Sequence, residues 1–228
     1  MKKLRIPLIA LSLLLFAVGC GKKVDDSVKT ESTKVEAKAV ADIAPNPADS
    51  LASKTFPLRS KNNTIVTIET DYGKMVFELY RDVAPAHADS FVARTKDGFY
   101  NGLIFHRVID NFMIQGGDPK GNGTGNAGYF LPAEFNELPH QDGTLSMARS
   151  QSPNSASCQF FICLARNRST AGLDRQYTVF GQLIKGYNVL HAIGSAEVVA
   201  NAQGKISKPK EDIVMRKVYV SDADGNAL

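Results

Sequence analysis

Tryptophan is missing from this sequence, and cysteine occurs only three times among its 228 residues. Cys158 and Cys163 stand five positions apart in one predicted strand, which separates them by about 16 Å. A disulfide needs Cα atoms within about 7 Å of each other, so these two cysteines cannot pair. We interpret both as thiols that pack like small apolar side chains, which leaves the redox compartment open.

A strong excess of charge of either sign is also missing. Three of the 27 Lys and Arg residues fall within residues 1–19, which contain no acidic side chain. The rest of the chain therefore has 24 basic and 23 acidic side chains, a net charge of +1. Nucleic-acid-binding domains need a basic surface, so the composition predicts no nucleic-acid partner.

Patterns for metal or nucleophilic chemistry are absent as well. The four histidines show no metal-ligand spacing, the cysteines form no C-x-x-C pair, and no serine lies in a G-x-S-x-G elbow. Residues 123–128 fit G-x-G-x-x-G, but Pro132 follows where the dinucleotide motif needs a helix. We expect no metal and no cofactor, and we interpret residues 123–128 as a surface loop.

Residues 1–19 have the layout of a secretory signal peptide. A basic start precedes the apolar residues 6–18, which are too few for a spanning helix of about 20 residues. The sequence AVGC at 17–20 resembles the bacterial lipobox, although Ala17 stands where leucine is usual. We expect Cys20 to be lipidated and to anchor the chain, at about 0.8 kcal/mol per buried CH₂. The alternative is an ordinary signal peptide with a chance cysteine.

Residues 20–61 are rich in small and charged side chains and lack the periodic apolar residues of a buried face. We interpret this segment, with the lipidated cysteine at its start, as a flexible tether with a span of roughly 35 Å. It would hold the following domain clear of a bilayer, outside the cytoplasm, in the periplasm or at the cell surface.

Residues 62–228 contain the patterns of one folded domain. A helix is predicted from Pro85 onward and another over 188–193. Many strands with short turns and only two helices predict a mainly β domain, an antiparallel barrel or sandwich. The predicted strands are residues 64–70, 74–80, 103–109, 112–116, 144–149, 159–165, 177–184 and 212–220.

Arg107 is unexpected within its predicted strand. Side chains alternate between the faces of a strand, so Arg107 would share a face with Phe105 and Ile109. Arginine is almost never fully buried unless it is paired. Gln115 and Gln159 also lie on apolar strands, and together the three predict a groove with a few placed hydrogen-bonding groups. The alternative is a barrel core whose polar side chains satisfy backbone groups.

Five longer motifs between residues 62 and 222 resemble the cyclophilins, the peptidyl-prolyl cis/trans isomerases: FHRVIDNFMIQGGD, GNGTG, LSMAR, SCQFFICLA and LDRQYTVFGQLIKG. The resemblance implies a closed eight-stranded antiparallel barrel capped by two α-helices. It also implies catalysis of X-Pro isomerisation in proline-containing peptides and in unfolded or folding proteins. We expect a monomer that needs no cofactor.

The resemblance further implies Arg107 as the catalytic residue. Arg149 departs from the asparagine, and Tyr177 from the histidine, that many members have. Gly172 stands where cyclosporin-sensitive members often carry tryptophan, so we expect weak cyclosporin binding. The positions implied to bind substrate are His106, Phe112, Met113, Gln115, Ala148, Arg149, Gln159, Phe161, Leu173 and Tyr177.

A buried arginine suits this reaction for a physical reason. Rotation about a peptide bond faces a barrier of roughly 18–20 kcal/mol because resonance makes the bond partly double. A guanidinium directed at the twisted imide would stabilise a state that neither ground state contains. We therefore expect a lipid-anchored prolyl isomerase. The alternatives are a proline-peptide-binding chaperone module without turnover and a structural envelope protein.

Overall fold

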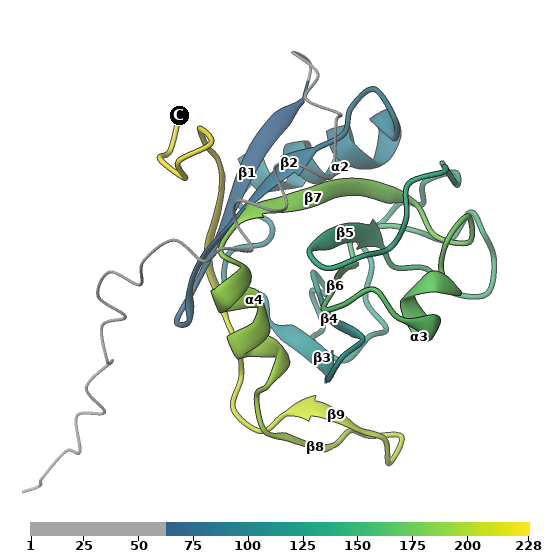
Figure 1. Cartoon of the computed structure of the whole chain (residues 1–228), viewed down its shortest axis with the longest axis vertical. Helices are drawn as coiled ribbons and strands as arrows, with labels where there is room; N and C mark the ends of the chain where they lie inside the picture. The colour runs from purple at the N-terminus through teal and green to yellow at the C-terminus, as the bar shows by residue number, and fades with distance from the viewer. Residues whose placement is uncertain (1–62) are drawn as a thin grey trace, which may run out of the picture. The chain divides into compact units, whose positions relative to one another are not determined.

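The computed structural model describes residues 63–228; the predicted signal peptide, Cys20 and the tether lie outside the described residues. In the described part, eight antiparallel strands form one curled sheet in the order β10-β1-β2-β7-β5-β6-β4-β3 (Figure 1). Its strands are β1 (Thr64–Thr70), β2 (Gly73–Leu79), β3 (Phe105–Ile109), β4 (Met113–Gly116), β5 (Thr144–Met147), β6 (Phe160–Cys163), β7 (Val179–Lys185) and β10 (Met215–Val220). Each predicted strand is therefore confirmed, most of them shortened by one to three residues.

The two edge strands of the sheet meet at their starts. Ile104 forms an isolated bridge with Val214, and the backbone N–H of Phe105 donates to the carbonyl of Ile213 at 2.9 Å. These contacts join Ile104 and the first residue of β3 to the residues just before β10, and the described sheet has no continuous ladder between the two strands. The mainly β, antiparallel architecture is confirmed, while full closure into a barrel stays a prediction.

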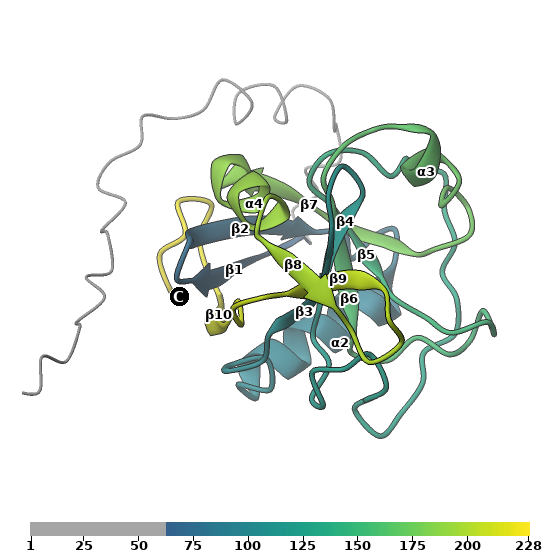
Figure 2. The same ribbon diagram turned by 90° about the horizontal axis from the view of Figure 1, so that it is seen from below.

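Two helices, α2 (Pro85–Lys96) and α4 (Tyr187–Gly194), pack against the main core of the curled sheet and lie apart from each other, α4 above and α2 below in Figure 2. Proline suits the first turn of α2 because its fixed φ is helical and the N–H it lacks would have no partner there. The carboxylate of Glu134 accepts hydrogen bonds from two backbone N–H groups in that same turn. Both helices were predicted from the sequence.

Three short elements were not predicted. Helix α3 (Arg168–Ala171) is a single turn whose first N–H groups are capped by the side chain of Asn167. Strands β8 (Val198–Ala200) and β9 (Ile206–Pro209) form a separate hairpin (Figure 2). They are too short to show a period, and the hairpin exposes its largest apolar side chain, that of Ile206.

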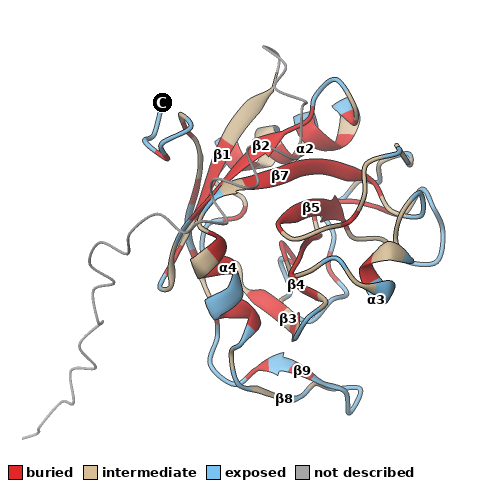
Figure 3. Ribbon diagram, viewed as in Figure 1, coloured by how far each residue is buried: buried red, intermediate tan, exposed pale blue. Residues whose placement is uncertain are grey.

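The central strands β5, β6 and β7 are buried on both faces along nearly their whole length (Figure 3). One face packs with the helices around stacked and edge-on aromatic rings, such as Phe91 against Tyr100 with ring centres 4.8 Å apart. The other face of β4 and β6 forms a smaller cluster of Met113, Phe161 and Cys163. This second cluster is the floor of the site described below.

The two cysteines of the domain are confirmed as buried free thiols. Cys158 packs in the main core and Cys163 in the smaller cluster. Burial raises the pKa of Cys158 to about 11 and that of Cys163 to about 12. Both therefore stay protonated near neutral pH and act as packing groups and not as nucleophiles.

Candidate active site

A bulge in β3 directs Arg107 away from the main core. The pairing of β3 with β4 shifts by one residue between Phe105 and Arg107, so strict alternation fails there. Phe105 and Val108 belong to the main core, whereas Arg107 and Ile109 lie on the side of the smaller cluster. The prediction that Arg107 shares a face with Ile109 is confirmed, and the prediction that it shares one with Phe105 was wrong.

A chain of hydrogen bonds holds the guanidinium of Arg107. Its Nη1 donates to Gln115 Oε1 at 3.1 Å, and Gln115 Nε2 donates to Gln159 Oε1 at 3.0 Å. Gln159 Nε2 ends the chain by donating to the backbone carbonyl of Gly125 at 2.8 Å. Each amide can satisfy both neighbours in only one orientation, so the chain fixes both glutamines and, through them, Arg107.

Arg107 keeps its charge in this setting. Burial lowers its pKa from the ordinary value, but a guanidinium remains protonated throughout the physiological range. Its hydrogen-bond partner is the neutral amide of Gln115, and no carboxylate ion pair with Arg107 occurs within residues 63–228. The positive charge is therefore positioned without being neutralised.

Arg107 borders a hollow of about 310 Å³ whose floor is apolar. A hollow of this size with a few polar groups is typical of a small-ligand site. Each residue of the lining is among those that the sequence predicted. They are Arg107, Phe112, Met113, Gln115, Ala148, Arg149, Phe161, Leu173 and Tyr177.

Two aromatic rings form one wall of this hollow. Phe161 and Tyr177 meet edge to face, with ring centres 5.6 Å apart and planes at 86°. Behind Phe161 lies the ring of His140, nearly parallel to it at 5.8 Å. Because Phe161 is only 5% exposed, the wall is backed by packed side chains and has little freedom to move.

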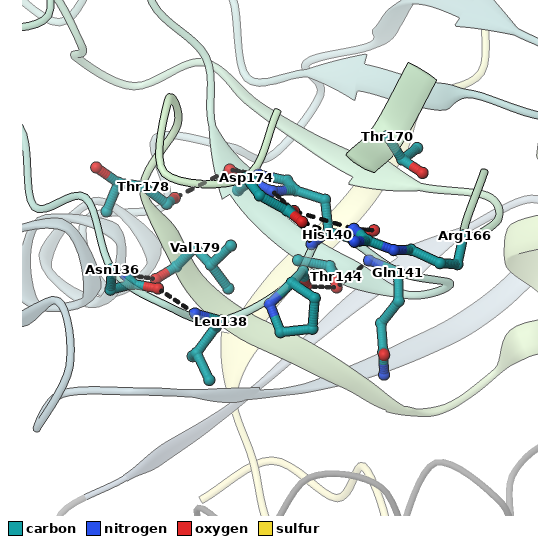
Figure 4. A network of polar contacts seen from close by, with 12 residues as sticks. Asn136, Leu138, His140, Gln141, Thr144, Arg166, Thr170, Asp174, Thr178 and Val179 are labelled. Atoms are coloured by element: carbon teal, nitrogen blue, oxygen red, sulfur yellow. Dashed lines mark hydrogen bonds and ion pairs between the residues drawn. The ribbon is translucent and has the colours of Figure 1, made fainter. Parts of the chain in front are cut away.

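His140 is held by a polar network that the sequence analysis did not identify (Figure 4). Both its backbone N–H, at 2.8 Å, and its Nδ1, at 3.1 Å, contact Asp174 Oδ1, and Asp174 also pairs with Arg166 at 2.7 Å. Although burial opposes ionisation, the bonds from Arg166 and His140 hold the pKa of Asp174 at about 2. Burial lowers the pKa of His140, so its ring is neutral near pH 7 and Nδ1 carries the proton that Asp174 accepts.

A second hollow of about 410 Å³ adjoins the first and shares Gln115, Ala148 and Arg149 with it. The glycine-rich loop, residues 119–128, borders this second hollow, whereas the sequence indicated only a surface loop at 123–128. The carboxylate of Asp118 shapes that loop by accepting backbone N–H bonds from Lys120 and Asn122. The full lining is Gln115, Gly123, Thr124, Gly125, Asn126, Phe130, Ala148, Arg149, Ser150, Ser155, Ser157 and Gln159.

Comparison with known proteins identifies the family. The model of the cyclophilin type peptidyl-prolyl cis-trans isomerase/CLD family matches residues 65–220. The chain belongs to this family. The cyclophilin prediction is thereby confirmed, and the activity of the chain is peptidyl-prolyl cis-trans isomerisation.

Individual relatives agree. The peptidyl-prolyl cis-trans isomerase of Acinetobacter baylyi is 43% identical, over 69% of this chain and 86% of that protein. A Streptococcus pyogenes protein whose name pairs a phosphatase with a peptidyl-prolyl cis-trans isomerase is 37% identical over 69% of this chain, which spans 38% of its length. A crystal structure of a Cryptosporidium parvum cyclophilin in the presence of the dipeptide Ala-Pro is 34% identical, with a TM-score of 0.63 over 69% of this chain and 99% of that one.

Two of the predicted substrate-binding residues lie apart from the first hollow of this cyclophilin. Gln159 lines the second hollow and supports Gln115 from there. His106 lines neither hollow and is 8% exposed, and neither of its ring nitrogens has a hydrogen-bond partner. Burial lowers the pKa of His106. Direct contact of His106 with substrate stays a prediction, and its position outside both hollows does not support it.

Arg149 lies where the two hollows meet. Its Nε and Nη2 donate to the carbonyl of Gln176 at 3.1 and 2.9 Å, and its Nη1 donates to the carbonyl of Ser150 at 2.9 Å. The guanidinium carbon is 4.6 Å from the centre of the Tyr177 ring, a cation–π contact. Arg149 therefore braces the aromatic wall, and its predicted contact with the substrate backbone stays a prediction.

No group of three or more His, Cys, Asp or Glu side chains within residues 63–228 is placed to hold a metal ion. In the same range, no helix has the length and apolar character needed to cross a bilayer.

Proposed function

We propose that this cyclophilin is a lipoprotein that isomerises X-Pro bonds in proteins outside the cytoplasm. The basic and apolar leader and the lipobox-like AVGC at 17–20 support export and lipidation at Cys20. The segment that follows, with its polar composition, would let the domain reach client chains near the membrane. The substrates would be unfolded or folding proteins with exposed prolines.

The first hollow supports a specific way of holding substrate. The proline ring would enter the hollow and pack against Phe161, Leu173 and Met113, which form its apolar surface. This placement leaves the imide bond at the rim, beside Arg107 and Gln115. The Ala-Pro dipeptide with which the Cryptosporidium cyclophilin was crystallised is consistent with binding of this kind.

Arg107 would act on the twisted imide. As the C–N bond rotates, conjugation is lost and the proline nitrogen becomes basic, so an N–H donor directed at it stabilises the transition state selectively. The observation that carries this proposal is a charged guanidinium fixed by a neutral amide at the edge of an apolar hollow. Low local polarity strengthens its hydrogen bonds, and no covalent step is needed.

An isomerase assay on a short X-Pro peptide tests this role. Removing a charged hydrogen bond worth about 1.5–3 kcal/mol in Arg107→Ala should lower kcat/KM by roughly 10- to 150-fold. Arg216→Ala is the matched control, because Arg216 pairs with Asp71 on the exposed surface and lines neither hollow. Equal activity of Arg107→Ala and wild type would refute the role of Arg107. Binding of the peptide without exchange between its cis and trans NMR signals would instead favour the chaperone alternative.

Lipidation is tested separately. Cells that express the full chain are fed a labelled fatty acid, and the protein is fractionated. We expect label and membrane association in wild type and the loss of both in Cys20→Ala. Equal labelling of the two proteins would contradict the proposed anchor and leave the isomerase role untouched.

A further inference from the structure

The two hollows are lined by positive charge only. Arg107 and Arg149 are the charged side chains of the combined lining, and no Asp or Glu of the described domain belongs to it. Arg107 lines the first hollow alone, whereas Arg149 stands between the two. A peptide that occupies both hollows must therefore pass a cation at the point where they join.

The guanidinium of Arg149 is fixed but not neutralised. Besides the bonds to Gln176 and Ser150, its Nη1 donates to the carbonyl of Gln151 at 3.1 Å. Its aromatic neighbours are Tyr177 and, at 5.7 Å, Phe135. These partners orient the group and carry no net charge, and no carboxylate of residues 63–228 forms an ion pair with it. A cation that is already held in place loses little entropy on meeting an anion.

Nearby carboxylates do not cancel this field. Asp118 lies beneath the glycine-rich loop, is 1% exposed, and is satisfied by backbone N–H groups of that loop. A Cβ built on Gly125 would approach its Oδ1 to 2.0 Å, so the loop backbone covers this carboxylate closely. Asp174, behind the aromatic wall, is paired with Arg166.

The relative position of the two hollows sets which substrate side chain meets Arg149. A residue before proline is biased toward extended backbone, and in extended chains side chains two positions apart point to the same side, about 6–7 Å from each other. The two hollows adjoin and share Gln115, Ala148 and Arg149, so with proline in the first hollow a side chain about 6–7 Å away would reach the second. That side chain would pass beside the guanidinium.

We propose that Arg149 makes this cyclophilin prefer substrates with an acidic side chain two residues from the proline and disfavour a basic one there. This preference rests on the proposed placement of proline in the first hollow. A carboxylate would gain the attraction of an oriented cation at the rim, and a lysine or arginine would meet like charge without a neighbouring acid. The substrate class is thus acidic proline-containing segments.

Two sets of peptides test the preference. In one set only the residue two positions before the proline varies, and in the other only the residue two positions after it. The variable residue is Glu, Gln or Lys, and kcat/KM is measured with the full chain at low salt. A rim ion pair is worth about 0.2–1 kcal/mol, so we expect Glu to exceed Gln by roughly 1.4- to fivefold, and Gln to exceed Lys by a similar factor. In about 1 M salt both ratios should fall toward one.

Variants assign the preference to one residue. The ratio of Glu to Lys peptides should collapse in Arg149→Gln, persist in Arg149→Lys, and persist in the surface control Arg216→Gln. The ratio is read independently of the overall rate, which Arg149→Gln can lower through the aromatic wall. If Arg149→Gln does not fold, the salt dependence of the wild-type ratio still decides.

The outcomes separate this proposal from the proposed function. If wild type does not accelerate isomerisation of the Gln peptide, the proposed function itself fails. If it does, and the Glu and Lys peptides react equally, or their ratio survives in Arg149→Gln or in high salt, the preference assigned to Arg149 is overturned.

Discussion

The hydrogen-bond chain behind Arg107 predicts that Gln159 affects catalysis through Gln115. Leucine in place of Gln159 keeps an apolar stem of similar size but removes the acceptor for Gln115 Nε2 and the donor to the Gly125 carbonyl. Gln115 could then turn away from Arg107. Of the two hydrogen bonds lost, only the one from Gln115 bears on Arg107; it is worth about 0.5–1.5 kcal/mol, so kcat/KM should fall by roughly two- to tenfold.

A double-mutant cycle distinguishes this indirect role from direct contact with substrate. We expect Gln159→Leu to lower activity in the wild-type background and to have little further effect in Gln115→Leu, because the chain is already broken there. For wild type, the two single variants and the double variant, kcat/KM is measured on one neutral X-Pro peptide, after thermal melts confirm folding. Gln203→Leu, in the exposed β8–β9 turn, is the matched control. Additive losses would refute the reasoning and would mean that Gln159 touches the peptide itself.

Further predictions concern stability and the aromatic wall. The free energy of unfolding should fall as the pH drops below about 6.5. Burial lowers the pKa values of His87, His106 and His140, so below that pH the unfolded state binds protons that the folded state does not. Thermal melts from pH 7 to 5 test this. His191, whose pKa is raised by a carboxylate, acts in the opposite direction. Gly186→Ala should cost about 1–3 kcal/mol more in chemical denaturation than Gly204→Ala: both have positive φ, but only at Gly186 would the Cβ clash with backbone, at 2.2 Å from the Lys74 carbonyl oxygen. Phe161→Ala should raise KM and lower stability by about 3 kcal/mol.

Much of the fold could be predicted from the sequence where a pattern was long enough. The hairpin of β1 and β2 alternates over seven residues on each side of a tight turn, and the structure pairs Thr64 with Leu79 and Thr70 with Gly73. The hairpin of β8 and β9 has three and four residues and places little apolar surface in the core. Short elements of this kind are specified by tertiary contacts, which periodicity does not record.

The bulge in β3 shows where pattern reasoning fails for a physical reason. Alternation assumes one residue opposite one residue, and a bulge breaks that count. Opposite the bulge, Gly116 has no Cβ, and one built there would lie 3.0 Å from the ring of Phe105. Glycine thus leaves space for Phe105 to turn inward while Arg107 turns outward. The sequence contains this glycine, but nothing in it marks the pairing partner.

The sequence likewise predicted the first hollow better than the second. The first hollow is built from strand residues and the loop residues next to them, all in or beside long motifs, so resemblance alone located its lining. The second hollow is built largely from loops that have no period and approach each other only in the folded chain. His140 lies beyond both, and its importance comes from stacking on Phe161 and from Asp174, 34 positions later in the sequence. Such partners become visible only when the fold brings them together.

Arg107 and Arg149 are both held in place by neutral partners. A cation that must act on a substrate needs to be held still, yet a carboxylate partner would neutralise the charge that it offers. Arg107 is held by the amide oxygen of Gln115, and Arg149 is held by backbone carbonyls beside an aromatic ring. Glutamate at position 115 could accept the same hydrogen bond with similar geometry, but it would lower the local potential at the imide. The neutral amide of Gln115 therefore positions Arg107 without a negative charge that would offset the charge of the guanidinium.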